Sequence, residues 1–502
     1  MPASKKGQVA FRLLRFYKFS RVLMHDKKGM LGMGILIFFT LIALIPPLIT
    51  PYNPVSIERE IAADLAYPTW IKYLPGYEKT SENLMPIEDP SFNTTTSLQE
   101  WVFSTLSQSQ NSTLEYVSNV GSPNSGPGCL AITFDRNATE PPEDVEDVLT
   151  KQFYYPYSDP PKRFKGQIYI KAEDVKDVQP WGVGVNVFIQ EFGGERRYLW
   201  SLKQGGNYQS EVWITPCITG VTKYPPLIDS YMLDPQGTIF SKQTNYVYGV
   251  EVVFSKDVQN ATVYIDDLDL KLYGNTFGLM GTDNVGRDLF TQLIYGTRIS
   301  LIVGLLSSAL SVTIGLGIGL FSAYLGRIAD QILMRFTDMF LVLPELPLLL
   351  VIIAVLGPSI WYIILLIGLL GWMGFARTVR SQVLSLKERP FVEAAKAVGA
   401  RKLHIIGRHI LPNVMNLVYV TLAISVPGAI MSEAYISFLG LYDPWIMTWG
   451  RMFHEALELP GGVERWWWII PPGLCIAIIS MSFVLIGYTL DEVLNPKLRE
   501  RR

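Results

Sequence analysis

The stretch "ISLIVGLLSSALSVTIGLGIGLFSAYLG" occupies Ile299–Gly326 and contains no charged side chain. A helix of about 20 apolar residues is long enough to cross the roughly 30 Å hydrocarbon core of a bilayer. The stretch therefore predicts a transmembrane helix. One such run is also compatible with a buried helix of a soluble protein, but this chain repeats the pattern. We therefore predict a multi-pass α-helical membrane protein with six transmembrane helices. The other five predicted spans are Gly29–Thr50, Ile332–Leu356, Ile360–Ala376, Val414–Ala434 and Trp468–Tyr488.

Small residues mark one face of the span that begins at Ile299. Ser311, Gly315 and Gly319 follow one another at intervals of four, and Gly304 and Ser308 form a second pair. Residues four apart lie on the same side of a helix, and small side chains let helices approach closely in a membrane. We expect this helix to pack inside a bundle.

Basic residues indicate the orientation of the chain. Lys and Arg concentrate in the N-terminal tail 1–28, in the loop 384–412 and in the tail after Tyr488. Six spans place these three segments on one side, which the positive-inside rule identifies as the cytoplasm. The segment 53–275 carries 29 acidic and 17 basic residues, in a chain of net charge −2. We therefore predict a cytoplasmic basic tail 1–28, a retained first span 29–50 rather than a cleaved signal peptide, an extracytoplasmic segment 51–275 and a helical core 276–502.

The predicted outer segment alternates short β-type runs with turn residues. Period-two patterning with β-branched and aromatic residues is typical of strands, and many short strands without a helical period predict a sandwich. Its closing stretch "VYIDDLDLKLYG" (Val263–Gly274) resembles the last strands of jelly-roll carbohydrate-binding modules. Four tryptophans are either core residues or sugar-stacking candidates: Trp101, Trp181, Trp200 and Trp213. The expected strands are Cys129–Phe134, Lys165–Ala172, Gly182–Phe192, Ser210–Thr215, Asn245–Phe254 and Asn260–Gly274.

Two further features concern the surface chemistry of this segment. Cys129 and Cys217 both fall in it, whereas Cys475 lies in the last span. Outside the cytosol two such cysteines can form a disulfide, and the sequence equally allows both thiols to be free. Four N-x-S/T sequons are candidate glycosylation sites, at Asn93, Asn111, Asn137 and Asn260.

Carboxylates inside the predicted spans are few. Glu345 lies between Pro344 and Pro347, and Glu433 lies near the outer end of the fifth span. Intramembrane carboxylates commonly mark a cavity or a buried partner. We take both as candidates for a translocation pathway, with a structural hydrogen bond or an interfacial position as the alternative. Asp338 follows Arg335 by three residues, so we expect those two to form an ion pair within one helix.

The loop 384–412 predicts two short helices. Pro390 suits the first turn of a helix, and Gly399 suits a left-handed residue that ends it. Ala400–Ile410 then predicts a second helix that Pro412 stops. Ala394, Ala395 and Ala397 give the first helix little bulk, so it fits the groove of a partner or forms an ordinary solvated loop.

The stretch "EAAKAVGARKLHIIGRHILPN" (Glu393–Asn413) resembles the EAA loop of binding-protein-dependent ABC importer permeases. Glu393, Ala394 and Ala395 match the opening of the motif, Gly399 its glycine, and Leu411–Pro412 its end. His409 departs from the hydrophobic residue of the broad family, and "RHILPN" is instead similar to the dipeptide/oligopeptide/nickel branch. Further matching blocks are Gly281–Leu301, Leu333–Pro344, Glu433–Leu441 and Asp491–Arg501, and together they are similar to the C-type subunit, with residues 51–275 as an unusually large insert.

The resemblance implies a type I ABC importer fold and a set of partners. It implies that the first loop helix, including Ala397, docks on one or two ATPase subunits, and that these subunits bind ATP and Mg²⁺. It also implies a second homologous permease in the lipid bilayer of the cell membrane and an extracytoplasmic solute-binding protein. We expect no cofactor, metal or nucleic acid in this chain, because no G-x-x-x-x-G-K-[ST] motif and no catalytic or zinc-type spacing occurs. The expected cargo is a di- or oligopeptide. The alternatives are an oligosaccharide importer of the same family, a membrane-anchored surface carbohydrate-binding or adhesion protein, and, with least support, a membrane enzyme.

Overall fold

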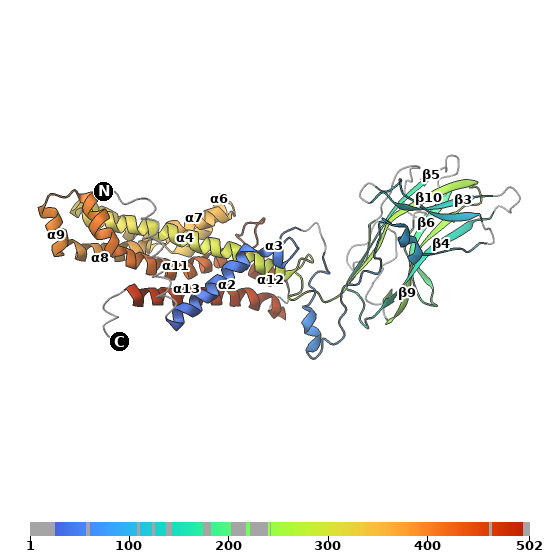
Figure 1. Cartoon of the computed structure of the whole chain (residues 1–502), viewed down its shortest axis with the longest axis horizontal. Coiled ribbons are helices and arrows are strands. Elements are labelled where there is room, and N and C mark those ends of the chain that lie inside the picture. The colour runs from blue at the N-terminus through green and yellow to red at the C-terminus, as the bar shows by residue number, and fades with distance from the viewer. Residues whose placement is uncertain are drawn as a thin grey trace, which may run out of the picture. The chain divides into compact units, whose positions relative to one another are not determined.

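The computed structural model describes residues 26–56, 61–107, 111–122, 126–136, 143–173, 182–201, 217–220, 239–240, 242–460 and 464–494. Its contacts divide the chain into two units. One unit joins Met1–Ile57 to Asp288–Arg502, and the other is Glu58–Arg287. The first unit is a bundle of helices and the second is built around strands (Figure 1).

The helices of the first unit run side by side along the bundle (Figure 1). Among the described residues, five helices are long and apolar enough to cross a membrane, or six if one bent pair is counted as a span. The helices are α2 (Lys27–Leu44), α3 (Pro46–Ile49), α4 (Leu289–Leu325), α5 (Arg327–Val342), α6 (Glu345–Leu356), α7 (Ile360–Leu370), α8 (Met373–Lys387), α9 (Pro390–Ala397), α10 (Lys402–Ile405), α11 (Leu411–Phe438), α12 (Trp449–Glu458) and α13 (Trp466–Leu494).

The bent pair corrects one predicted span. Residues 332–356 were expected to form one helix, but α5 and α6 meet at an angle of 84°. Leu343 has the extended conformation (φ −71°, ψ 133°) that the following Pro344 imposes, so the helix ends there and a new one starts at Glu345. Proline in the interior of an apolar run is therefore the reason for the error.

Glycines set the helix packing, as the spacing of small residues predicts. A Cβ on Gly304 would lie 2.7 Å from Ile430 of α11, and one on Gly319 would lie 2.7 Å from the Ala376 carbonyl of α8. A Cβ on Gly315 would similarly meet the Trp372 carbonyl at 2.8 Å. These positions let α4 run through the centre of the bundle in direct contact with α8 and α11.

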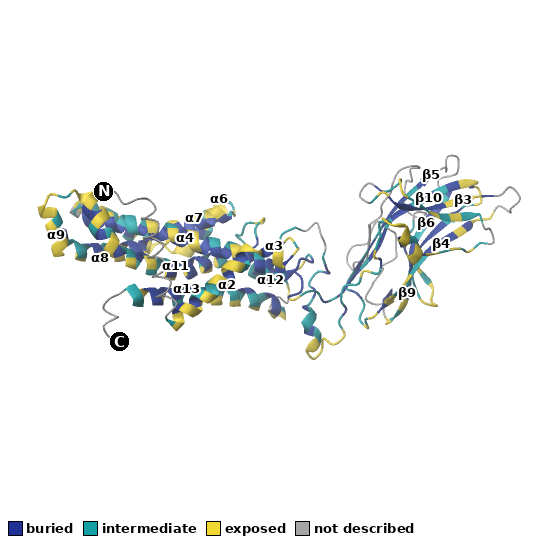
Figure 2. Cartoon of the chain, viewed as in Figure 1, coloured by how far each residue is buried: buried dark blue, intermediate teal, exposed yellow. Residues whose placement is uncertain are grey.

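The second unit contains a sandwich of two five-stranded antiparallel sheets, which confirms the all-β insert. The sheet orders are β1-β4-β9-β6-β7 and β2-β3-β10-β5-β8. Buried residues alternate with more exposed ones along the strands (Figure 2) and fill one core between the sheets. In this core the ring of Phe134 stacks on that of Phe254, with centroids 4.8 Å apart. The strands are β1 (Val102–Thr105), β2 (Ser112–Val117), β3 (Cys129–Asp135), β4 (Val145–Tyr155), β5 (Arg163–Glu173), β6 (Val183–Glu191), β7 (Arg196–Ser201), β8 (Cys217–Gly220), β9 (Thr244–Phe254) and β10 (Asn260–Tyr273).

The sandwich does not bring the two cysteines of the predicted disulfide together. Cys129 is a buried free thiol on β3, and burial raises its pKa to about 12. Cys217 lies on β8, whose side chains are outside the described residues, and β10 and β5 separate β8 from β3. Three strand spacings amount to about 14 Å, whereas a disulfide needs Cα atoms within about 7 Å.

The boundary of the second unit lies further along the chain than predicted. Residues up to Arg287, rather than 275, belong to it. The Thr282 side chain donates to the Ala63 carbonyl (2.5 Å) and accepts from the Ala66 amide (2.8 Å), while Asp283 accepts from Arg287. These bonds hold the residues before α4 against the start of the same unit.

Candidate functional site

The first loop helix, α9, lies at the end of the bundle opposite to α12 (Figure 1). Pro390 occupies its first turn, and Gly399 follows it with φ +82°. The amide of Ala400 donates to the Ala395 carbonyl (3.1 Å) and that of Gly399 to the Lys396 carbonyl (2.9 Å). The predicted start of the helix and its left-handed glycine end are confirmed.

One face of α9 anchors it to the bundle. Val392 is fully buried and Ala395 is half-buried, and both belong to a core that includes Val383 of α8, Ile405 and Ile410. Because these contacts join α9 to α8 on one side and to the residues before α11 on the other, the helix is a fixed part of the helical unit.

The opposite face of α9 is open. Glu393, Ala394, Ala397 and Gly399 are exposed, and Val398 is 89% exposed. Nearby in the sequence, Leu403 is 72% exposed. Apolar side chains in a polar loop that the chain itself does not cover are typical of a surface for another protein.

The second loop helix corrects the prediction for Ala400–Ile410. An α-helical turn at Lys402–Ile405 passes into a π-helix, Ile406–Ile410, which continues directly into α11. Pro412 does not stop a helix: it comes just after the π-helical turn Ile406–Ile410, and the helix continues through it into α11. Leu411 is half-buried and Pro412 exposed. The chain from Lys402 to Phe438 is thus one continuous helical element.

The structure separates the two intramembrane carboxylates. Glu345 is exposed at the first residue of α6, immediately after the bend. Glu433 is 0% exposed on α11 and accepts a hydrogen bond from the Ser437 hydroxyl at 2.7 Å. Glu345 therefore faces a surface that other molecules can reach, whereas Glu433 is sealed by its own chain.

Ion pairs fasten α5 to α8. The predicted Arg335–Asp338 pair is wrong, because Asp338 pairs with Arg377 of α8 instead. Arg380 donates to both oxygens of Asp330, at 2.5 and 2.6 Å. The side chains of two helices meet here, which spacing within one helix does not reveal.

Sequence reasoning missed α12, a short helix at the other end of the bundle. Its Arg451 and Glu455 are both buried and form an ion pair of 2.8 Å, and Arg451 also donates to the carbonyls of Pro444 (2.8 Å) and Ile446 (3.2 Å). Thr448 caps the helix by accepting from the Arg451 amide. The cap residue before an amphipathic run was the available signal.

The sugar-stacking candidates receive no support. Trp101 is buried against Phe92 and Tyr248, and Trp200 is half-buried against the core. Trp181 and Trp213 lie outside the described residues. Within those residues, no group of His, Cys, Asp or Glu side chains large enough for a metal ion is found.

The glycosylation sites stay predictions. Asn93 and Asn260 are exposed, and Asn111 is half-buried. Asn137 lies outside the described residues.

Comparison with known proteins finds two family models, both of permease subunits. The family model "Binding-protein-dependent transport system inner membrane component" matches residues 315–500, and "N-terminal TM domain of oligopeptide transport permease C" matches residues 16–68. The dipeptide transport system permease protein DppC of Bacillus subtilis is 37% identical over 222 residues, which cover 44% of this chain and 68% of DppC. The oligopeptide transport system permease protein OppC of Haemophilus influenzae is 39% identical over 227 residues, 44% of this chain and 71% of OppC.

Two solved structures are similar to parts of the chain. A chain of the methionine ABC transporter MetNI is matched with 17% identity and a TM-score of 0.31, over 42% of this chain and 96% of that one. TmCBM61, solved in complex with β-1,4-galactotriose, is matched with 14% identity and a TM-score of 0.23, over 37% of this chain and 97% of that one.

Proposed function

Because this chain belongs to the family of binding-protein-dependent transport system inner membrane components, we propose that it is the permease subunit of an ATP-driven importer of di- and oligopeptides. It is a multi-pass membrane protein, and as a member of a family of permease subunits it is not itself the ATPase. The match of the family model to residues 315–500, which include α9, carries this conclusion. The names of the relatives, which transport dipeptides and oligopeptides, support peptides rather than oligosaccharides as the cargo.

The open face of α9 is the surface for the ATPase subunits. ATP and Mg²⁺ bind to those subunits, and their closure moves α9. Since Val392 and Ala395 fix α9 to α8 and to the helix that continues into α11, the movement reaches two spans as a rigid-body displacement. The spans then shift between inward-open and outward-open states, and a solute-binding protein delivers the peptide from outside.

The exposed face of α5 and α6 is the side on which the second permease completes the pathway. Ile332, Met339 and Val342 are exposed along α5, and Glu345 follows them at the bend. A carboxylate on that face is suited to meet the cationic amino terminus of a peptide. Glu433 is a structural clamp in this conformation rather than a residue of the pathway, because its own chain covers it completely.

We place the sandwich outside the cell and the loop with α9 inside. The balance of charges supports this orientation, since the sandwich segment is acidic and the loop and the tails are basic.

A site-specific cross-link tests the proposal. A cysteine at Ala394, in a chain whose native cysteines are replaced by serine, should cross-link to an ATPase subunit in the assembled complex. ATP should change the yield. A cysteine at Ser381, which is exposed on α8, is the matched control and should cross-link much less. Absence of a cross-link from Ala394 in the presence and the absence of ATP contradicts the docking role, and failure of the complex to accumulate labelled peptide in vesicles contradicts the assignment of cargo.

A further inference from the structure

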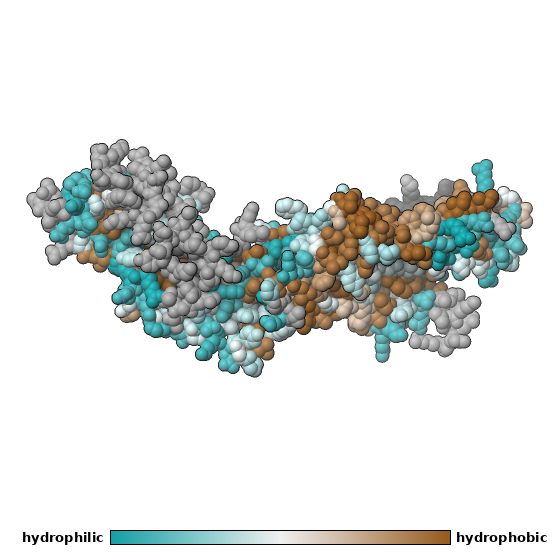
Figure 3. Space-filling view, turned by 180° about the vertical axis from the view of Figure 1, so that it is seen from behind, coloured by the Kyte–Doolittle hydropathy of each residue, from teal (hydrophilic) through white to brown (hydrophobic). Residues whose placement is uncertain are grey.

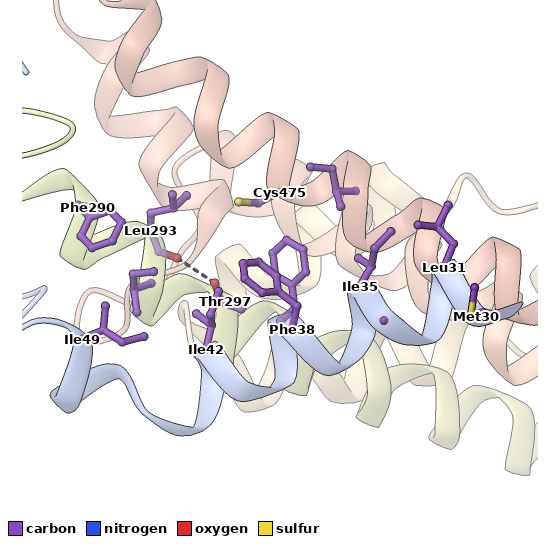
Figure 4. Close-up of a pocket in the computed structure, with 14 residues that line it drawn as sticks. Met30, Leu31, Ile35, Phe38, Ile42, Ile49, Phe290, Leu293, Thr297 and Cys475 are labelled. Atoms are coloured by element: carbon purple, nitrogen blue, oxygen red, sulfur yellow. Dashed lines mark hydrogen bonds between the residues drawn. The ribbon is translucent and has the colours of Figure 1, made fainter. Parts of the chain in front are cut away.

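A groove runs along the helical unit between α2, α4 and α13 (Figure 4). Its volume is about 840 Å³. On α2 it extends from Met30 to Ile42, and twelve steps of about 1.5 Å make it roughly 18 Å long. This length is close to the thickness of one leaflet of a hydrocarbon core of about 30 Å.

The walls of the groove are apolar. Leu31, Ile35 and Phe38 of α2 line it together with Leu293 of α4 and Ile478 of α13. Thr297 carries the one hydroxyl among the lining residues, and it donates to the Leu293 carbonyl of its own helix at 3.1 Å (Figure 4). A polar solute or a chain of water molecules finds no partner here, so the groove fits hydrocarbon.

The size of most lining residues argues against a second helix as the occupant. Gly34 lines the groove, and a Cβ there would meet nothing within 4 Å. The other lining residues are mostly large and aliphatic or aromatic, whereas helix contacts in membranes favour small and polar residues.

The surroundings of the groove favour a lipid. Phe38, Leu41 and Leu44 expose apolar side chains along α2, so the groove is a recess in the surface that faces hydrocarbon; an apolar belt over the helical unit is visible in Figure 3. Lys27 and Lys28 are exposed one turn before Leu31, on the same side of the helix. Two cations at the end of an apolar groove match the headgroup of an anionic lipid.

We propose that this groove binds an acyl chain of an anionic phospholipid whose phosphate lies beside Lys27 and Lys28. The lipid joins α2 to α4 and α13 along about one leaflet. This proposed lipid site lies on the side of the bundle formed by α2, α4 and α13. It does not depend on whether the transporter carries peptides.

Photo-cross-linking in the assembled transporter tests the proposal. The complex is placed in nanodiscs that contain phosphatidylglycerol with a diazirine near the end of one acyl chain. After irradiation, mass spectrometry should find adducts concentrated at the end of the groove away from Lys27 and Lys28, on Phe38–Ile42 of α2 and Phe290–Ile294 of α4. Gly34→Phe fills the groove without meeting its own chain and should lower these adducts about tenfold, the factor for two methylenes that lose contact. Gly34→Leu is a second variant with a smaller side chain and a smaller loss.

Two controls make the result specific. Gly317→Phe on α4 also enters open space but lies outside the groove, so it should leave the adducts unchanged. Lys27→Gln and Lys28→Gln should each lower the preference for phosphatidylglycerol over phosphatidylcholine about fivefold. Adducts spread evenly over α5 and α2 and insensitive to Gly34→Phe would overturn the proposal in favour of ordinary boundary lipid. Absence of adducts from the groove residues would overturn it in favour of a protein segment that covers the groove.

Discussion

The sandwich and the helical bundle differ in how far their apolar side chains are buried. In the sandwich, Phe134, Val250 and Phe254 are completely buried between two sheets. In the bundle, Leu44 and Val342 are 72% and 82% exposed. The described core of the sandwich is thus covered by its own two sheets, whereas the bundle leaves many large apolar side chains for lipid or other subunits to cover.

Two carboxylates, one from each unit, show the same difference. On the sandwich, the buried Glu251 is satisfied by Arg196 at 2.6 Å and Asn186 at 2.8 Å, both from neighbouring strands. In the bundle, Glu345 and the residues Glu393, Ala394 and Ala397 of α9 are exposed, and we propose that other subunits cover them. Changes in the bundle are therefore expected to act on transport, and changes in the sandwich on local stability.

The largest expected effect is at α9. Gly399→Pro should reduce peptide uptake to background, because proline fixes φ near −65° where the chain needs +82°, and removes the amide that bonds to the Lys396 carbonyl. Glu393→Lys should do the same by reversing the charge on the docking face. Uptake by reconstituted vesicles measures both.

A matched variant sharpens this test. Glu388→Lys makes the same change of charge at an exposed residue just before α9 and should transport normally. Protease resistance of the sandwich should be unchanged in all three variants. Normal uptake by Glu393→Lys would show that the bundle does not depend on this contact.

The next effect concerns the sandwich alone. Phe254→Ala removes a fully buried ring that stacks on Phe134, which should lower the free energy of unfolding of the sandwich by about 3–5 kcal/mol. Pulse proteolysis in urea should show earlier cleavage in β9 and β10 and no change in α4 or α11. If α4 and α11 lost protection from the protease at the same urea concentration, the two units would not unfold independently.

Substitution of Glu433 in the bundle should have an effect of intermediate size. Glu433→Ala leaves the buried hydroxyl of Ser437 without its acceptor, and should cost about 1–3 kcal/mol in thermal stability of the complex. Glu433→Gln keeps an acceptor and should cost less and retain uptake. A loss of uptake in Glu433→Gln at unchanged stability would instead return this residue to the translocation pathway.

The sequence predicted those features that depend on local pattern. Long apolar runs predicted the membrane bundle, Pro390 and Gly399 predicted the bounds of α9, and alternation predicted strands such as β9. The spacing of Gly315 and Gly319 correctly indicated close helix packing. Each of these depends on the chemistry of a few neighbouring residues.

The features that it missed depend on contacts between distant segments. The partner of Asp338 lies on α8, and the sealing of Glu433 depends on how α11 packs. The separation of Cys129 from Cys217 follows from the order of strands in a sheet, which spacing along the chain does not contain. The bend at Pro344 and the continuation of the helix through Pro412 show that proline has opposite effects at two positions of the same bundle.

The smallest expected effect is a pH dependence confined to the sandwich. Burial raises the pKa of Asp147, which is completely buried on β4 and accepts a hydrogen bond from Thr105 at 2.7 Å. An acid whose pKa is higher in the folded state stabilises the fold fully below its unfolded pKa of about 3.9, and this contribution is lost as the pH rises through the folded pKa. The free energy of unfolding of the sandwich should therefore fall as the pH rises above about 4.

Asp147→Asn should flatten this slope and raise the free energy of unfolding near pH 7 by on the order of 1 kcal/mol. Glu146→Gln, at an exposed neighbour on the same strand, should leave the slope unchanged. Pulse proteolysis from pH 4.5 to 7.5 measures the slope, and an equal slope in Asp147→Asn and the unmodified chain would rule out this carboxyl as its source.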